Sequence, residues 1–193
     1  MYKIYAKSSI GYNHIKNKKP CQDFSSFYQD PQRMVITCCD GHGGDMYIRS
    51  KLGSLFASKA IMKTFSELSP YLLRQYDDKE IEDKIKLQIL CDWNRQVEES
   101  ISFDPIHKYE LEGLDEDQIL SLRINPAKAY GTTLSGALLV GNKLVVASIG
   151  DTECLLIRKG QIEKIFDDSD EPVGNVTYSM CQEDAYKHLR VKL

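Results

Sequence analysis

The residues of this chain that are best suited to chemistry directly follow an apolar run. The run RMVITCC (33–39) ends at DGHGG (40–44). Glycines permit positive φ and close backbone approach, so this turn can expose the Asp40 carboxylate and the Gly41 carbonyl together, with His42 beside them. Mg²⁺ and Mn²⁺ prefer such oxygen ligands. On this segment alone, a tight turn with an incidental histidine remains the alternative.

A second acid stands in the same kind of place. Asp151 follows the apolar run LVVASI and Gly150, as Asp40 follows its own run. Two acids after apolar strands predict carboxylates that converge at one end of a sandwich. Asp23 opens another short strand and is a weaker candidate, because a lone aspartate there is usually a turn former. The residues GTT (131–133) open a further strand and are small enough for close packing.

Two other kinds of site are excluded by the pattern. The segment 131–136 has the glycine spacing of a phosphate-binding loop, but Ala137 stands where a lysine is required and a strand follows instead of a helix. Cys38 and Cys39 are adjacent on a predicted strand, so they point to opposite faces and cannot easily share one tetrahedral zinc site.

The elements that must position these residues are strands near both ends of the chain, with helices between them. An alternating pattern at 2–10, a short segment at 23–29 and a nearly continuous apolar run at 33–39 predict three strands. Apolar residues at helical spacing predict helices at 45–68 and 78–101. The chain then returns to a meander at 131–140, 143–150, 153–160 and 161–166, with short strands at 174–180 and 188–193.

This order of elements has no βαβ alternation, so it predicts an α+β fold with antiparallel sheets. Residues 103–128 are expected to form an exposed connection or an inserted lobe. Their acidic run ELEGLDEDQ is expected to be a solvated face or the start of a helix.

Composition narrows the class of protein. A chain of 193 residues with 42% hydrophobic and 27% charged residues fits a single globular domain. The net charge of −3 argues against a general nucleic-acid binder. No signal peptide or membrane span is indicated, and the six cysteines show no C-x-x-C spacing. We therefore expect a cytoplasmic protein with reduced thiols and no membrane partner.

Taken together, these segments resemble the metal-dependent protein phosphatases of the PP2C (PPM) family, particularly its bacterial members. The matching segments are CQDF (21–24), DGHGG (40–44), GTTL (131–134) and VVASIGDTECLL (145–156), in the order of the family. The resemblance implies one PP2C-like domain over 1–193. It also implies an antiparallel β-sandwich flanked by helices in α-β-β-α layers, with a binuclear Mn²⁺ or Mg²⁺ centre at one end.

The resemblance also implies metal-binding roles for particular residues. Asp40 would bridge the two metals, and the Gly41 carbonyl would bind one of them. Asp23 would act through a water, and Asp151 matches an acid that serves a third metal in bacterial relatives. The implied reaction is hydrolysis of phosphoserine and phosphothreonine in proteins by a water that two cations activate.

Two implied residues concern the substrate rather than the metals. His42 would be the general acid for the leaving serine or threonine oxygen. Lys18 stands where some relatives have an arginine that grips the phosphate, and a lysine attracts a phosphate without clamping it bidentately. Gln22 stands where many relatives have a glutamate.

The largest departure from the family lies after Asp151. The family completes its metal site with aspartates in a DG and a DN pair, whereas none of the later aspartates here is followed by Gly or Asn. We expect the C-terminal part of the domain to be missing. Two hypotheses follow: a weak or inactive phosphatase domain, or an inactive module that binds phosphoproteins or another partner. In either case, exposed sheet edges would allow a homodimer or a strand donated by another chain.

Overall fold

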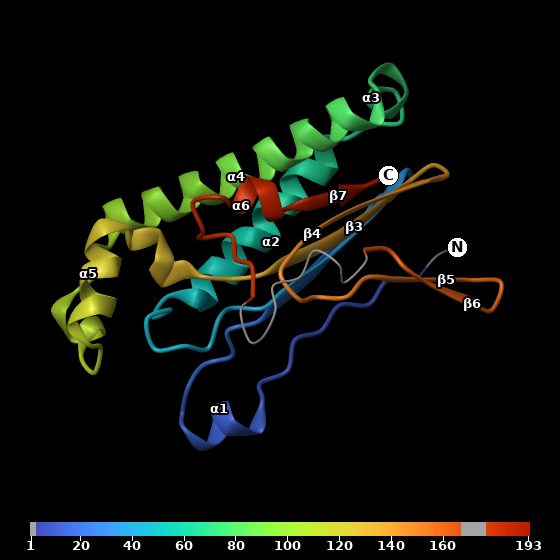
Figure 1. Ribbon diagram of the computed structural model, residues 1–193. Helices are drawn as coiled ribbons and strands as arrows, with labels where there is room; N and C mark the ends of the chain where they lie inside the picture. The colour runs from blue at the N-terminus through green and yellow to red at the C-terminus, as the bar shows by residue number, and fades with distance from the viewer. Residues whose placement is uncertain (1–2, 167–176) are drawn as a thin grey trace.

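Five antiparallel strands form the central sheet of the structure, a computed structural model that describes residues 3–166 and 177–193. Their order in the sheet is β1-β2-β3-β4-β7, and each neighbouring pair is antiparallel (Figure 1). The strands are β1 (Phe24–Gln29), β2 (Arg33–Cys39), β3 (Leu134–Val140), β4 (Lys143–Ile149) and β7 (Arg190–Lys192). The predicted α+β class with antiparallel sheets is confirmed.

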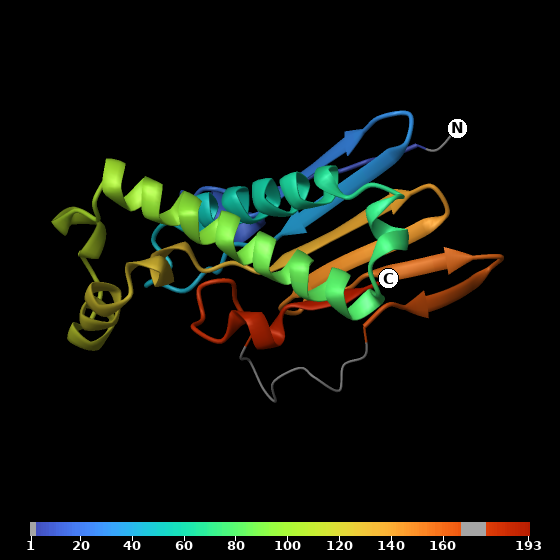
Figure 2. The same cartoon turned by 90° about the horizontal axis from the view of Figure 1, so that it is seen from above.

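Two long helices, α2 (Ser50–Glu67) and α4 (Asp78–Phe103), cover one face of this sheet (Figure 2). Both predicted helices are therefore confirmed, although α2 begins five residues later than expected because 44–49 is taken up by turns. The amide of Tyr47 donates to the Gly44 carbonyl at 3.0 Å, which closes one of those turns. The helix α4 begins with a capping box between Asp77 and Glu80.

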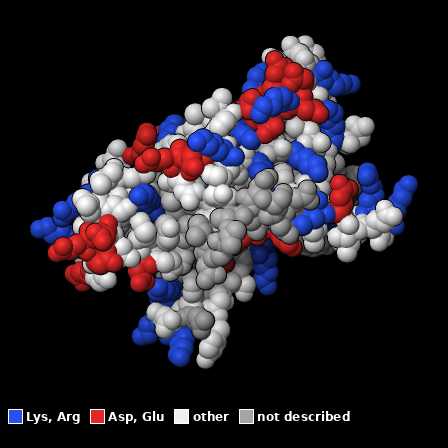
Figure 3. All heavy atoms as spheres, viewed as in Figure 1, with Lys and Arg blue, Asp and Glu red and all other residues white. Residues whose placement is uncertain are grey.

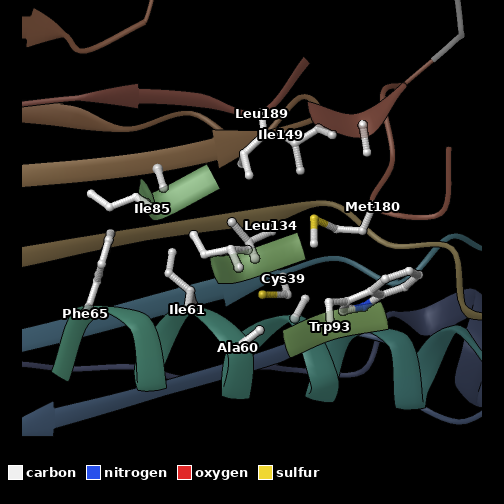
Figure 4. Packing of buried hydrophobic residues seen from close by; sticks show 14 of the residues in the cluster. Cys39, Ala60, Ile61, Phe65, Ile85, Trp93, Leu134, Ile149, Met180 and Leu189 are labelled. Atoms are coloured by element: carbon white, nitrogen blue, oxygen red, sulfur yellow. The ribbon is translucent and has the colours of Figure 1, made fainter. Parts of the chain in front are cut away.

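The hydrophobic core lies between these helices and the sheet (Figure 4). Its largest fully buried side chains include Trp93, Tyr130, Phe65, Ile61, Ile85, Leu134 and Leu138. The Trp93 indole N–H donates to the Gly53 carbonyl at 3.1 Å, so its polar atom is satisfied. A Cβ at Gly53 would lie 1.9 Å from the Tyr130 carbonyl oxygen, so only glycine allows the chain at 130 to approach α2 this closely.

Three strand predictions need correction. Residues 3–11 form no strand, because their backbone is not paired with a neighbouring strand and an extended segment is not stable alone. In the predicted strand 174–180, residues 174–176 lie outside the described residues and 177–180 form no strand. The meander is also divided: β5 (Leu155–Arg158) and β6 (Gln161–Lys164) pair with each other in a separate two-stranded sheet.

The remaining elements are short. The connection 103–128 contains a 3₁₀ turn η1 (Lys108–Leu111), the helix α5 (Glu116–Ile124) and the start of η2 (Pro126–Tyr130). Other short helices are α1 (Tyr12–Lys16), α3 (Leu72–Gln75) and α6 (Ala185–His188). In Figure 1, α5 lies at one end of α4 and α3 at the other, while β5–β6 projects on the side of the sheet away from α4.

Candidate metal and phosphate site

The strand register brings the candidate acids to one end of the sheet. Phe24 lies opposite Cys39 in the β1–β2 pair, so one further step in the same register sets Asp23 opposite Asp40. On the other side of Asp40, the β2–β3 register continues to a bridge between Gly41 and Thr132. Two separate segments of the sequence therefore deliver neighbouring carboxylates.

The main chain of Asp40 is fixed by the segment that precedes β3. The amide of Thr133 and the hydroxyl of Thr132 both donate to the Asp40 carbonyl, at 2.8 and 2.9 Å. The Asp40 amide donates to the Thr133 hydroxyl at 3.0 Å. The sequence predicted only close packing for GTT. Threonine hydroxyls often form hydrogen bonds to main-chain groups, and this tendency was the signal for the role of Thr132 and Thr133.

Gly41 has no room for a side chain. A Cβ there would lie 2.6 Å from the Gln22 carbonyl oxygen and 2.8 Å from the Ser50 carbonyl oxygen, both of them main-chain atoms. The amide of His42 donates to the Gly131 carbonyl, and Thr133 donates to Asp40, so Gly41 is a non-hydrogen-bonded partner of Thr132. Its own carbonyl therefore points away from the 131–133 segment.

Asp151 reaches the same end of the sheet from β4. The β3–β4 register sets Leu134 opposite Ile149, so Gly150 follows opposite Thr133. Gly150 has φ +96°, and a Cβ there would lie 2.6 Å from the Thr133 methyl group. This turn leaves Asp151 exposed, and its carboxylate accepts a hydrogen bond from the Thr177 hydroxyl at 3.3 Å.

Asp23, Asp40 and Asp151, which we call the acid cluster, repel one another. The pKa of Asp40 rises to about 6 because partial burial of the carboxyl disfavours its charge, because it shares a hydrogen bond with Asp23, and because Asp23 and Asp151 are negative. The His14 imidazole opposes this rise. His14 belongs to none of the sequence motifs described above. Its proximity to Asp40 depends on the loop that carries α1.

His42 lies beside the acid cluster in a fixed setting. Its ring packs edge-on against the Tyr47 ring, with centroids 4.8 Å apart. A Cβ at Gly131 would lie 2.8 Å from the imidazole and 2.4 Å from the Tyr47 ring, so Gly131 provides the space for both. Burial lowers the pKa of His42, while the negative charge of Asp151 acts in the opposite direction.

Gln22 ties this loop to α2. Its side-chain amide donates to the His42 carbonyl at 3.1 Å and to the Ser50 hydroxyl at 2.6 Å. Lys18, in contrast, is exposed in the loop after α1, and within the described residues its ammonium makes no ion pair or hydrogen bond. Its neighbour Lys19 lies 3.7 Å from the Asp45 carboxylate.

The donor types of this site suit a hard divalent cation, because carboxylates that repel one another are stabilised by a cation between them. Within residues 3–166 and 177–193, however, the set of metal ligands is incomplete. Among the residues that the structure describes, no three His, Cys, Asp or Glu side chains converge closely enough to hold a metal ion.

Comparison with known proteins gives consistent matches. Residues 10–193 match the family model of protein phosphatase 2C. A probable protein phosphatase 2C 43 from Arabidopsis thaliana is 30% identical over 150 residues, which is 74% of this chain and 28% of that protein. The fold is similar to a crystal structure of a bacterial serine phosphatase that carries a point mutation, with a TM-score of 0.50 and 21% identity over 90% of this chain and 64% of that chain.

A further match is the catalytic domain of the serine/threonine protein phosphatase PstP in complex with two manganese ions, at a TM-score of 0.48 and 16% identity. It covers 97% of this chain and 69% of that chain. The chain thus spans less than a third of the Arabidopsis protein and under two thirds of the bacterial serine phosphatase.

Proposed function

The chain belongs to the protein phosphatase 2C family, and from that premise we propose that it binds divalent cations at the acid cluster and hydrolyses phosphoserine and phosphothreonine in proteins. The observation that carries the proposal is the repulsion among Asp23, Asp40 and Asp151 at one end of the sheet. Carboxylates that repel one another in this way are typical of a cation site, because the cation removes a repulsion that otherwise destabilises the fold.

The positions of the residues support the roles that we propose for them. Asp40, Asp23 and the Gly41 carbonyl would hold Mn²⁺ or Mg²⁺, and Asp151 would hold an additional ion. When bound, these ions would neutralise the phosphate and acidify a water. The threonine contacts to Asp40 keep its main chain, and with it Gly41, in one position while charge accumulates nearby.

His42 is the candidate proton donor for the leaving oxygen. Burial favours its neutral form in the free protein. A phosphate dianion that enters beside it would raise its pKa, because an opposite charge favours the protonated imidazole. His42 would therefore take up a proton on substrate binding and return it to the leaving serine or threonine. Lys18 would only attract the phosphate, since it is exposed and unrestrained.

The test has two arms, one for cations and one for turnover. Titration calorimetry with Mn²⁺ should show binding to the wild type and at least about tenfold weaker binding to Asp40→Asn, because one ligand charge is removed. Hydrolysis of p-nitrophenyl phosphate in Mn²⁺ should disappear in the same variant. Unchanged Mn²⁺ binding in Asp40→Asn would contradict the proposed site.

One observation favours a second function. No three ligating side chains converge within the described part of the chain, so a module that binds phosphoproteins without turnover fits the same cluster. Mn²⁺ binding and phosphopeptide binding without hydrolysis would support this function, and turnover that is lost in Asp40→Asn would exclude it.

The sheet edge at β1 is part of the proposal. Phe27 and Tyr28 on this edge strand are 51% and 43% exposed, and an edge strand of this kind can pair with another chain. We therefore propose a homodimer, or strand addition by a partner, at β1. Light scattering should show a dimer for the wild type and a monomer for Phe27→Lys; a wild type that is monomeric at all concentrations and captures no partner strand would contradict it.

A further inference from the structure

A cavity opens beside the acid cluster. It has a volume of about 560 Å³ and is lined by residues that include Gln22, Gly43, Gly44, Tyr47, Glu112 and Leu114. Gln22 precedes Asp23, and Gly43 follows His42, so two walls of the cavity continue directly into the candidate centre. An extended peptide spans about 3.5 Å per residue. A residue one to a few positions from a bound phosphoresidue can therefore reach this cavity.

The third wall comes from the connection after α4 and is held rigidly. Arg49, only 6% exposed, makes a bidentate ion pair with Glu110 at 2.8 and 2.7 Å. Its guanidinium also donates to the carbonyls of Asp104 and Pro105, at 2.6 and 3.1 Å. Because Arg49 directly precedes α2, the wall at 110–114 is fixed against the loop that carries His42. The cavity is therefore formed before any ligand enters it.

The charges that remain free in the cavity are acidic. The positive charge of Arg49 is matched internally by Glu110. Lys19 is balanced by Asp45 at 3.7 Å. Glu112 is exposed, and within the described residues it has no cationic partner. The cavity thus presents one uncompensated carboxylate.

The acidic character continues outside the cavity. Figure 3 shows acidic side chains, with basic ones beside them, at the end of the molecule where α5 lies. The exposed acids of 104–124 are Asp104, Glu112, Asp115, Glu116 and Asp117, against the exposed cations Lys108 and Arg123. Pro20, Tyr47 and Leu114 add apolar wall to the cavity. An apolar wall that ends at a carboxylate suits a side chain with an aliphatic stem and a cationic head.

From this geometry we infer that the cavity is a subsite for an arginine or lysine next to the phosphorylated residue of a protein substrate. The inference rests on the proposed function and narrows its substrate class to phosphoproteins with basic flanking residues. Glu112 would pair with the cationic head, and Tyr47 and Leu114 would pack against its stem. Charge complementarity of this kind contributes more to selectivity than to total affinity.

The test compares short phosphothreonine peptides that differ only in having arginine or glutamate beside the phosphothreonine. Fluorescence anisotropy in Mn²⁺ should show about three- to tenfold tighter binding of the arginine peptide to the wild type. Glu112→Lys should abolish or reverse this ratio. It should leave Mn²⁺ binding and p-nitrophenyl phosphate turnover unchanged, because Glu112 has no place in the proposed centre.

Glu163→Lys is the matched control, since it makes the same charge change at an exposed position on β6. It should keep the arginine preference. An arginine preference that survives in Glu112→Lys, or that Glu163→Lys reduces equally, would overturn the subsite. Equal binding of both peptides to the wild type would overturn the subsite and leave the proposed function in place. If the wild type bound neither Mn²⁺ nor any phosphopeptide, the proposed function and this inference would fail together.

Discussion

Around Arg49 opposite charges meet, whereas around Asp40 like charges meet. Arg49 is almost fully buried and satisfied by Glu110, by two main-chain carbonyls and by the Tyr130 hydroxyl at 2.9 Å. Asp40 is exposed and has Asp23 and Asp151 as neighbours. The two residues are close together in sequence. The arrangement around Arg49 stabilises the fold, whereas the arrangement around Asp40 keeps a repulsion that a bound cation can relieve.

This difference distinguishes charged residues that stabilise the fold from charged residues that are available for function. We call Arg49 and the groups that it contacts, Glu110 among them, the Arg49 cluster. There, the hydrogen bond from Arg49 keeps the pKa of Glu110 below its usual range, so pairing in the folded state favours the charged forms of both Arg49 and Glu110. In the acid cluster the pKa of Asp40 rises to about 6, so folding disfavours its charge. A group whose charge is disfavoured by the fold and left exposed is a candidate for function.

Breaking the Arg49 cluster should have the largest effect. Arg49→Met leaves Glu110 without its partner in a site where Glu110 is only 16% exposed. Urea denaturation at pH 7 should show a loss of about 3–5 kcal/mol in the free energy of unfolding. The double variant Arg49→Met/Glu110→Gln should lose less, because no unpaired charge remains in the buried part of the site. A loss below about 1 kcal/mol in the single variant would mean that the pair is not a structural anchor.

Filling the space at Gly41 should have the next largest effect. Gly41→Ala places a Cβ against two main-chain oxygens that cannot rotate away. The free energy of unfolding should fall by about 1–3 kcal/mol. Gly11→Ala is the control, because a Cβ there meets nothing within 4 Å, and its change should stay within about 0.5 kcal/mol. Equal stability of both variants would show that the chain relaxes at Gly41.

Removing the charge of Asp40 should have the smallest effect and the opposite sign. In metal-free buffer at pH 7.5, Asp40→Asn should raise the free energy of unfolding by about 1 kcal/mol, a value reduced for solvent screening because Asp40 is exposed. The folded protein holds the Asp40 proton up to a pKa of about 6, against 3.8 in the unfolded chain. Wild-type stability from this group should therefore fall as pH rises from about 4 to 6.

Denaturation with EDTA at several pH values between 4 and 7.5 checks this dependence. The difference between the wild type and Asp40→Asn should vanish near pH 4, because the wild-type carboxyl is then protonated. A difference that is constant across this range would show that the effect is not electrostatic.

Local patterns were sufficient to predict part of this structure. The spacing of Ile81, Ile85, Ile89, Trp93 and Val97 predicted a helix with one buried face, and all five are buried in α4. The apolar run before DGHGG predicted β2. The candidate acids were found because each follows or opens a strand, which is a local signal.

Other features depend on distant contacts and left no local signal. Residues 2–10 have an alternating pattern, but a strand also needs a paired neighbour, and none is present along 3–11. Arg49 lies 61 positions from Glu110, and nothing near Arg49 in the sequence indicates that pair. His14 lowers the pKa of Asp40, and nothing near His14 in the sequence indicates that the two residues are close.

The bonds between Asp40 and the two threonines have a consequence for how the protein folds. They join residues 92 and 93 positions apart in the chain, and the β2–β3 pair that carries them must close a loop containing α2 and α4. Loops of this length close slowly, and non-local strand pairs form late in folding. The helices can therefore form while Asp40 and Asp151 are still far apart. Mn²⁺ added at the start of refolding should stabilise the product without accelerating the first steps, since the cluster does not exist until the last strands pair.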